Sequence, residues 1–286
     1  MPELPEVETT VRGLRKTIKG LVIRDVWTDL NTKDKRQRES VANPKYFKNF
    51  KKEIIGKRIL LAERRAKNIL INLSGAKTIL IHMKMTGHLL YGKYKQDPIN
   101  RFIHFTITFN NKEKLYFSDM RKFGKITLLS TKVAHDTKHL NNIGPEPLEK
   151  KFTIVNFQER LAKKSNAKIK IALMDQSVIA GIGNIYSDEI LWRAGVHPER
   201  RISKVHDREL KLIFKAIKET LKKGIDFGGD SMSDYRNIYG LPGKFQLHHQ
   251  AYLRTGEKCR KRGCNGIIKR ILINSRSAHF CSKHQK

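Results

Sequence analysis

Residues 68–83, NILINLSGAKTILIHM, decide the fold class of the N-terminal half of this chain. Two runs rich in Ile and Leu, at 68–73 and 78–83, flank the turn residues Ser74 and Gly75. Short apolar runs separated by turn residues are typical of paired β-strands. The stretch therefore predicts two strands of a sheet, and the segments around it extend that sheet.

A helix and further short strands surround this pair. Residues 3–19 carry acids at their start and cations at their end, and apolar residues from Val7 to Ile18 share one helical face. Many short strands with no long helices between them indicate a β-sandwich or barrel. The other segments expected as strands are 21–27, 58–63, 102–109, 114–118 and 125–129.

The chain has 286 residues, which is enough for two domains and a small appendage. After the strands the pattern becomes helical, with helices expected at 151–163, 167–175, 183–195 and 206–223. The sequence thus predicts a β-domain at 1–131, a linker at 132–150, a helical domain at 151–249 that ends in a polar, mobile loop from residue 228, and a short cysteine-containing module at 250–286.

The charge points to a polyanionic partner. Lys and Arg number 59 against 27 Asp and Glu, a formal net charge of +32. Because such an excess repels itself, it favours nucleic acid as the partner, and a solvated Lys-rich surface is the alternative. Hydrophobic residues make up 39% of the chain, which excludes a wholly disordered protein. The charge alone does not separate DNA from RNA, or binding from catalysis.

Several classes of protein are excluded by simple features. The sequence contains no run of 18 apolar residues, so we expect no membrane span. The first residues, MPELPE, lack the apolar core of a signal peptide. The three cysteines all follow residue 258, so we expect no disulfide framework and a cytoplasmic setting.

The cysteines and a histidine form a candidate metal site. Cys259 and Cys264 are separated by four residues, and Cys281 and His284 by two. Two close pairs of soft ligands predict one structural zinc ion, Zn2+, which would supply folding energy to a module too short for its own core. The alternative is three incidental thiols and a surface histidine. His279 is a weaker candidate for the fourth ligand.

Two turns are candidate phosphate contacts. Residues 267–280 indicate a β-hairpin with Arg276 at its tip, where an arginine is suited to a phosphate or a DNA groove. Residues 180–184, AGIGN, join two expected helices, and their glycines allow close approach of a phosphate to a helix start. The nearby Lys168 and Lys170 support this reading. A plain helix–helix turn and a solvated cation are the alternatives.

The N-terminus offers a nucleophile. Pro2 becomes a secondary amine if Met1 is removed, and such an amine can attack an aldehyde-like sugar carbon and form a Schiff base. An α-amino group loses its proton near pH ~8, and Glu3 beside it could move protons. Because proline is common at position two, composition alone leaves this reading open.

Taken together, these motifs resemble the bacterial formamidopyrimidine-DNA glycosylases. The matching blocks follow the family order over nearly the whole chain. They are MPELPEVE at 1–8, RRAK at 64–67, HMKMTG at 82–87, DMRKFG at 119–124, GPEP at 144–147, LMDQ at 173–176, GIGNIY at 181–186, and the terminal finger.

The resemblance implies an α+β fold: an N-terminal helix plus a β-sandwich domain, a helix–two-turns–helix domain, and a C-terminal β-hairpin zinc finger. It implies a monomeric base-excision repair enzyme of the bacterial cytoplasm, working at the nucleoid with no membrane partner. The enzyme would remove oxidised purines such as 8-oxoguanine and formamidopyrimidines from double-stranded DNA through a Schiff base at the N-terminal proline. As an AP lyase it would then cut abasic sites by β,δ-elimination.

The resemblance also implies roles for single residues. Pro2 corresponds to the nucleophile, Glu3 to the residue that protonates the sugar oxygen, and Lys67 to a lysine that contacts the damaged site. Glu6 corresponds to a carboxylate near the pocket, and 228–245 to the lesion-recognition loop. The expected DNA contacts are the void-filling residues Met85, Arg121 and Phe123, and the phosphate-binding residues Lys170, Asn184 and Arg276.

Two questions stay open. The family finger usually has two Cys-x-x-Cys pairs, whereas here the first pair is wider and His284 replaces the fourth cysteine, a ligand set that zinc tolerates. The alternative functions are an endonuclease VIII-like glycosylase for oxidised pyrimidines and a non-catalytic binder of damaged DNA. Leu4, the void-filling residues and the long loop favour oxidised purines, and the intact Pro2, Glu3 and Lys67 favour catalysis.

Overall fold

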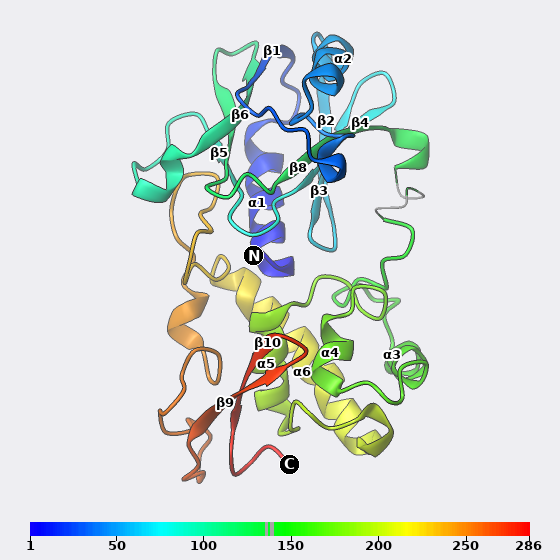
Figure 1. Cartoon of the computed structure of the whole chain (residues 1–286), viewed down its shortest axis with the longest axis vertical. Helices are drawn as coiled ribbons and strands as arrows, with labels where there is room; N and C mark the ends of the chain where they lie inside the picture. The colour runs from blue at the N-terminus through cyan, green and yellow to red at the C-terminus, as the bar shows by residue number, and fades with distance from the viewer. Residues whose placement is uncertain (135–136, 138–139) are drawn as a thin grey trace. The chain divides into compact units, whose positions relative to one another are not determined.

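The computed structural model describes residues 1–134, 137 and 140–286, which form two compact units (Figure 1). Unit 1 contains Met1–Asn141 and Phe227–Lys244, and unit 2 contains Asn142–Asp226 and Phe245–Lys286. Part of the expected linker, residues 135–136 and 138–139, lies outside the described residues.

Unit 1 contains two antiparallel four-stranded sheets, as the sequence predicts. One sheet has the strand order β1-β6-β7-β5 and the other the order β2-β3-β4-β8. The quoted stretch forms the hairpin β3–β4, in which Leu73 pairs with Lys77. The strands are β1 Ile23–Thr28, β2 Ile59–Arg65, β3 Asn68–Leu73, β4 Lys77–His82, β5 His88–Tyr91, β6 Ile103–Phe109, β7 Lys114–Ser118 and β8 Lys125–Ser130.

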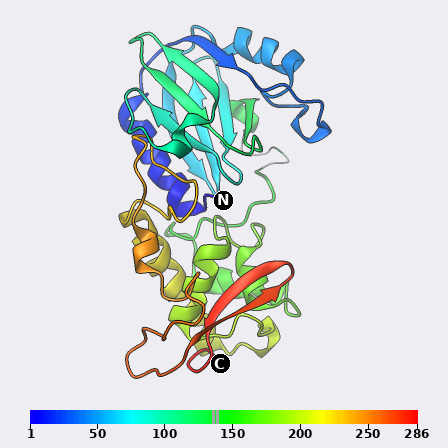
Figure 2. The same cartoon turned by 60° about the vertical axis from the view of Figure 1, so that its left-hand side comes forward.

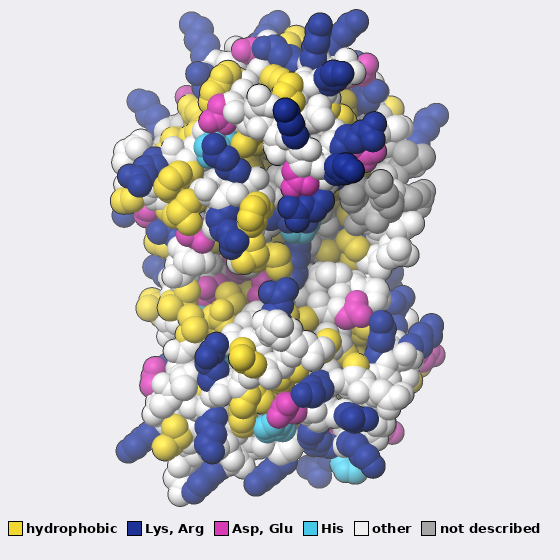
Figure 3. Space-filling view, viewed as in Figure 1, with side chains coloured by type: hydrophobic (Ala, Val, Ile, Leu, Met, Phe, Trp, Pro, Cys, Tyr) yellow, Lys and Arg dark blue, Asp and Glu magenta, His cyan; other side chains and the backbone are white. Residues whose placement is uncertain are grey.

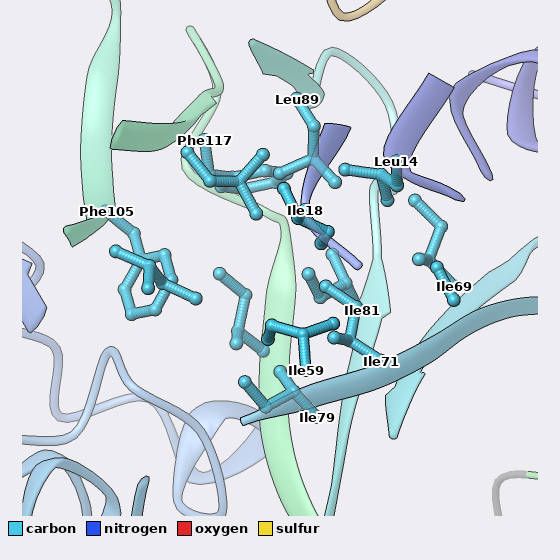
Figure 4. Close-up of a cluster of buried hydrophobic side chains, with 14 of the residues drawn as sticks. Leu14, Ile18, Ile59, Ile69, Ile71, Ile79, Ile81, Leu89, Phe105 and Phe117 are labelled. Atoms are coloured by element: carbon cyan, nitrogen blue, oxygen red, sulfur yellow. The ribbon is translucent and has the colours of Figure 1, made fainter. Parts of the chain in front are cut away.

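The hydrophobic core of unit 1 receives side chains from both sheets and from helix α1, Leu4–Thr17 (Figure 4). Phe105 and Phe117 come from one sheet, Ile71 and Ile79 come from the other, and Leu14 comes from α1. Burying such a side chain contributes about 1.5–3 kcal/mol. This shared core confirms the predicted helix-plus-sandwich domain.

Two elements of unit 1 were not predicted from the sequence. Helix α2, Pro44–Ile54, begins where the Asn43 side chain accepts a hydrogen bond from the backbone N of Tyr46 at 3.1 Å, and it buries Phe50 and Ile54. Its apolar stripe is narrow among many lysines, which weakens the helical pattern. Strand β5 has only four residues, too few for a clear alternation.

The segment Phe227–Lys244 corrects the expected domain division, which placed it in the helical domain as a mobile loop. Ile238 is 1% exposed and belongs to the core of unit 1. Its carbonyl accepts a hydrogen bond from the Tyr91 backbone N at 2.9 Å, so the segment extends the edge of β5. A Cβ on Gly13 would lie 2.7 Å from the Ile238 side chain, so α1 needs a glycine at this contact.

Unit 2 contains four helices and the predicted C-terminal hairpin. Figures 1 and 2 both show the hairpin lying against α5. The hairpin turns at Asn274 and Ser275, which have φ values of 46° and 61°, and Arg276 begins the second strand next to this turn. The elements are α3 Ile154–Ala162, α4 Ile169–Met174, α5 Asn184–Ala194, α6 Asp207–Asp226, β9 Ile268–Ile273 and β10 Arg276–Cys281.

The surface reflects the composition. On the visible face of each unit, Lys and Arg side chains predominate over Asp and Glu (Figure 3). None of the helices in the described part of the chain has both the length and the hydropathy of a membrane-spanning segment.

Candidate functional site

The start of α1 is held by two carboxylates. The Glu3 side chain accepts a hydrogen bond from the backbone N at the third helical position, and the Glu3 backbone N donates to Glu6 Oε2 at 2.7 Å. This reciprocal arrangement is a capping box, and acids at this end suit the helix dipole. Glu3 is 2% exposed and Glu6 is 1% exposed, so both carboxylates are held in place beside Pro2.

Pro2 is buried behind Met1, whose side chain is 43% exposed. While Met1 is attached, the nitrogen of Pro2 is part of an amide and has no lone pair for attack. Removal of Met1 converts that nitrogen into a secondary amine next to Glu3. A secondary amine and a carboxyl group then occupy one rigid helix start, an arrangement that can form a Schiff base and move a proton.

Lys67 lies in a two-residue turn between β2 and β3. Ala66, its neighbour in the turn, has a φ of 52°, and Lys67 is 6% exposed. Arg64 links this turn to α1, because it donates to the Ala66 carbonyl at 3.1 Å and to Glu8 at 3.0 Å. Burial opposes ionisation of Glu8, but Arg64 and Arg12 outweigh it and hold the pKa of Glu8 below its ordinary value.

In unit 1, the loop that carries Met85 is bonded to the loop that carries Arg121 and Phe123. The Thr86 hydroxyl donates to Asp119 and accepts from the Arg121 backbone N at 3.1 Å. The other oxygen of Asp119 accepts from the Gly124 backbone N at 2.7 Å, so one carboxylate holds both loops. Sequence reasoning did not single out Asp119 or Thr86, because their role depends on this contact.

The three side chains at these loops point to solvent. Met85 is 38% exposed and Phe123 is 47% exposed, so neither is a core residue. The Arg121 guanidinium lies 4.6 Å from the centre of the Phe123 ring, within cation–π range. A cavity of about 380 Å³ adjoins them and is lined by Met1, Asp34, Arg36, Gln37, Lys84, Met85, Phe123 and Lys125.

In unit 2 the structure brings Asn184 close to the hairpin residue that follows Arg276. Asn184 is the first residue of α5, and its Nδ2 donates to Ser277 Oγ at 3.1 Å. Its Oδ1 is buried and has no hydrogen-bond partner among the described residues. Arg276, the residue before Ser277, is exposed. A helix N-terminus with an arginine and an amide nearby is suited to a phosphate.

Lys170 has a different place from the expected phosphate contact. Its side chain is 0% exposed, and its ammonium lies 2.5 Å from Asp188 Oδ1 and 3.1 Å from Ser187 Oγ. A fully buried, paired ammonium does not reach a ligand in solvent, so the expectation for Lys170 is corrected. Lys168, the N-cap residue of α4, is half-buried and pairs with Glu199 at 2.6 Å.

Cys259, Cys264, Cys281 and His284 form the predicted metal-binding cluster, because one donor atom of each lies within 4.8 Å of the others. The sulfurs of Cys264 and Cys281 are 3.6 Å apart, and His284 Nδ1 is 3.3 Å from the Cys259 sulfur. Ligands of a tetrahedral zinc ion lie about 3.5–3.8 Å from one another, so this donor set fits. His279 is outside the cluster and bonds Asp188 instead.

The orientation of His284 is fixed from outside the cluster. Its Nε2 donates to the Trp192 carbonyl at 2.9 Å, which leaves the Nδ1 lone pair for a metal. Burial lowers the pKa of His284, which favours the neutral ring that binds metals. The amide of Gly266 holds the pKa of Cys264 below its ordinary value, which favours the thiolate.

Comparisons with known proteins agree along the whole chain. Residues 1–126 match the family described as formamidopyrimidine-DNA glycosylase N-terminal domain, and residues 143–236 match its H2TH domain. The formamidopyrimidine-DNA glycosylase of Herpetosiphon aurantiacus is 38% identical over 98% of each chain. That of Bacillus subtilis is 36% identical over 100% of this chain and 99% of its own.

Solved structures give the same answer. A mutant of the Lactococcus lactis protein in complex with a Fapy-dG containing DNA has a TM-score of 0.87 at 34% identity, covering 100% of both chains. The Lactococcus lactis protein with an abasic site containing DNA also has a TM-score of 0.87 at 34% identity, over 99% of both. This chain therefore belongs to the formamidopyrimidine-DNA glycosylase family.

Proposed function

We propose that this protein excises oxidised purines, namely 8-oxoguanine and formamidopyrimidines, from double-stranded DNA in base excision repair and cleaves the resulting abasic site. One observation carries the proposal: Pro2 and Glu3 occupy a rigid, capped helix start in a chain that matches the family from end to end. The solved relatives in complex with DNA that contains Fapy-dG or an abasic site support this substrate class.

The proposed chemistry begins at the processed N-terminus. The Pro2 nitrogen attacks C1′ of the damaged nucleotide and the glycosidic bond breaks. The base leaves with its electron pair and takes up the proton that the Pro2 nitrogen loses. Glu3 protonates the ring oxygen as the sugar opens, which leaves an iminium between Pro2 and C1′. β-Elimination then breaks the bond to the 3′ phosphate, and δ-elimination breaks the bond to the 5′ phosphate.

The DNA contacts we propose use both units. In unit 1, Lys67 contacts the damaged nucleotide, and the exposed Met85, Arg121 and Phe123 fill the gap left by an extruded base. In unit 2, Asn184 and Arg276 bind phosphates. The working form is a monomer in the bacterial cytoplasm at the nucleoid. The expected division into 1–131, 151–249 and 250–286 changes at Phe227–Lys244, which belongs to unit 1.

We propose that the metal cluster holds one Zn2+ ion. The ion would balance the thiolate charges of Cys259, Cys264 and Cys281 and fix the finger, and it takes no part in the reaction. His284, with its ring held by the Trp192 carbonyl, completes the four donors.

The test is borohydride trapping on a duplex with 8-oxoguanine opposite cytosine, using protein whose Met1 has been removed. We expect a covalent adduct at Pro2 and strand cleavage, and neither from protein that retains Met1, in which the Pro2 nitrogen is an amide, but that still binds the duplex. Adduct formation on thymine glycol but not on 8-oxoguanine would instead support the oxidised-pyrimidine branch. Binding without adduct or cleavage on any lesion would leave a non-catalytic binder.

A further inference from the structure

One face of α5 is bonded to the C-terminal segment at every turn. Three residues spaced by four along the helix each contact a different residue of that segment, and such spacing puts them on one side of a helix. The pairs are Asn184 Nδ2 with Ser277 Oγ at 3.1 Å, Asp188 Oδ2 with His279 Nδ1 at 2.9 Å, and the Trp192 carbonyl with His284 Nε2 at 2.9 Å.

The middle one of these three contacts, between Asp188 and His279, is buried. Asp188 is 1% exposed as a residue, and its Oδ2 accepts from both the backbone N and Nδ1 of His279, each at 2.9 Å. Its Oδ1 accepts from Lys170 on α4 at 2.5 Å. The His279 ring packs edge-on against Tyr252 with centroids 5.1 Å apart. One carboxylate therefore joins α4, α5 and β10.

This arrangement is better suited to setting a position than to adding stability. Removing two charges from water costs several kcal/mol per ion, so a buried ion pair often stabilises no more than apolar residues of similar volume. The hydrogen bonds do fix how α4 and β10 are placed on α5, because all three donors to Asp188 must meet its two oxygens. A sliding or twisted β10 would leave these buried groups without partners.

Asp188 and its partner His279 each lie close in sequence to one of the proposed phosphate contacts. Asn184 lies one helical turn before Asp188 in α5, and Arg276 lies three residues before His279 in β10. Those separations correspond to about 6 Å along a helix and about 10 Å along a strand. The bond between Asp188 and His279 therefore sets the register of β10 on α5, and with it where Arg276 stands relative to Asn184.

We propose that Asp188 is a positioning residue for DNA binding, with Lys170 as its buried counter-ion and His279 as its contact on the hairpin. This inference rests on the proposed contact of Asn184 and Arg276 with DNA phosphates. Asp188 does not touch DNA. It aligns the two phosphate contacts so that one duplex engages both.

The test replaces the charges in a way that permits folding. Lys170→Met combined with Asp188→Leu removes both charges together and so leaves no unpaired buried ion. We expect this double variant to keep zinc, as measured by metal analysis of the purified protein. Its Kd for a duplex with an abasic-site analogue should rise about tenfold, and the slope of log K against log salt should fall by about 1, the loss of one phosphate contact.

A kinetic readout separates positioning from general damage. At saturating abasic duplex, cleavage by the double variant should keep the parent rate constant, because Pro2 and Glu3 lie in unit 1. General unfolding would lower that rate constant and leave the salt slope unchanged. Failure of the parent itself to bind or cleave abasic duplex would refute the proposed function, whereas the ratio of variant to parent tests only Asp188.

Two further variants serve as rescue and control. Lys170→Met with Asp188→Asn restores an oxygen acceptor for His279 and should return Kd to within about threefold of the parent. Arg193→Gln with Glu219→Gln removes an exposed ion pair, 2.6 Å between Arg193 of α5 and Glu219 of α6, and should leave Kd and slope unchanged.

The outcomes decide as follows. Parent-like Kd and slope in the variant with Lys170→Met and Asp188→Leu would overturn the proposal. An equal rise in Kd in the variant with Lys170→Met and Asp188→Asn would overturn it as well. If the variant with Lys170→Met and Asp188→Leu does not fold, His279→Phe keeps the ring against Tyr252 and removes only the side-chain bond to Asp188. It should then raise Kd about threefold with a reduced slope, and an unchanged Kd and slope in that variant would overturn the proposal.

Discussion

Replacing Ile238 by alanine should destabilise unit 1, although Ile238 lies far along the chain from the sheets. Ile238 is 1% exposed in the core of unit 1, and the change removes three carbon atoms. At about 0.8 kcal/mol per buried CH₂ the transfer free energy lost is about 2.4 kcal/mol. The cavity left against α1 brings the expected loss in the free energy of unfolding to about 3–4 kcal/mol.

Urea unfolding followed by tryptophan fluorescence measures this loss. The chain has two tryptophans, Trp27 in unit 1 and Trp192 in unit 2, so a Trp192→Phe background lets Trp27 report on unit 1. Leu241→Ala in the same segment is the control, because Leu241 is 42% exposed and should change stability by less than about 1 kcal/mol. A loss below about 1 kcal/mol for Ile238→Ala would refute the assignment of this segment to the core of unit 1.

Three further predictions concern charge, metal and the exposed loops. The pKa of Glu8 lies below its ordinary value of about 4.5, so ionised Glu8 stabilises the fold above that pH and this contribution is lost as pH falls through the lowered pKa. Unfolding free energies measured down to about pH 3 should therefore fall less steeply for Glu8→Gln than for the parent, and parallel curves would contradict the role of Arg64. His284→Cys should still bind one Co²⁺ per chain, with an absorption spectrum changed from three sulfurs and one nitrogen to four sulfurs, and an unchanged spectrum would show that His284 is not a ligand. Phe123→Ala should lower 8-oxoguanine excision about tenfold in single-turnover assays while the melting temperature stays within about 2 °C, since the ring is 47% exposed; a large drop in melting temperature would mark Phe123 as structural.

Local pattern predicted most of the regular structure. The β3–β4 hairpin, the C-terminal hairpin and the four helices of unit 2 follow from apolar periodicity and turn residues, which act over a few positions. The metal donors followed from spacing, which also favoured His284 over His279, and the fold shows what holds His279 outside the cluster. His279 is held outside the cluster by Asp188 of α5, which accepts a hydrogen bond from its ring.

The features that sequence reasoning missed depend on distant partners. Lys170 looks like a surface cation until Asp188, 18 positions away, supplies a buried counter-ion. The segment Phe227–Lys244 looks like a polar loop, because its buried apolar side chains are few, Tyr235 and Ile238, and their partners lie far away in α1 and β5. No local pattern encodes a contact of this kind.

Because Phe227–Lys244 belongs to unit 1, recombination between homologous genes and the design of chimaeras are both constrained. A recombination event at residue 142 between two family members would exchange the helices and the finger, but it would also import a foreign Ile238 and Tyr235 into the recipient's own sandwich. Those residues must fit Gly13, Glu6 and the edge of β5, which the recipient gene supplies. A single crossover at the boundary between the two family domains therefore divides unit 1, and chimaeras should exchange α1, β5 and this segment as one set.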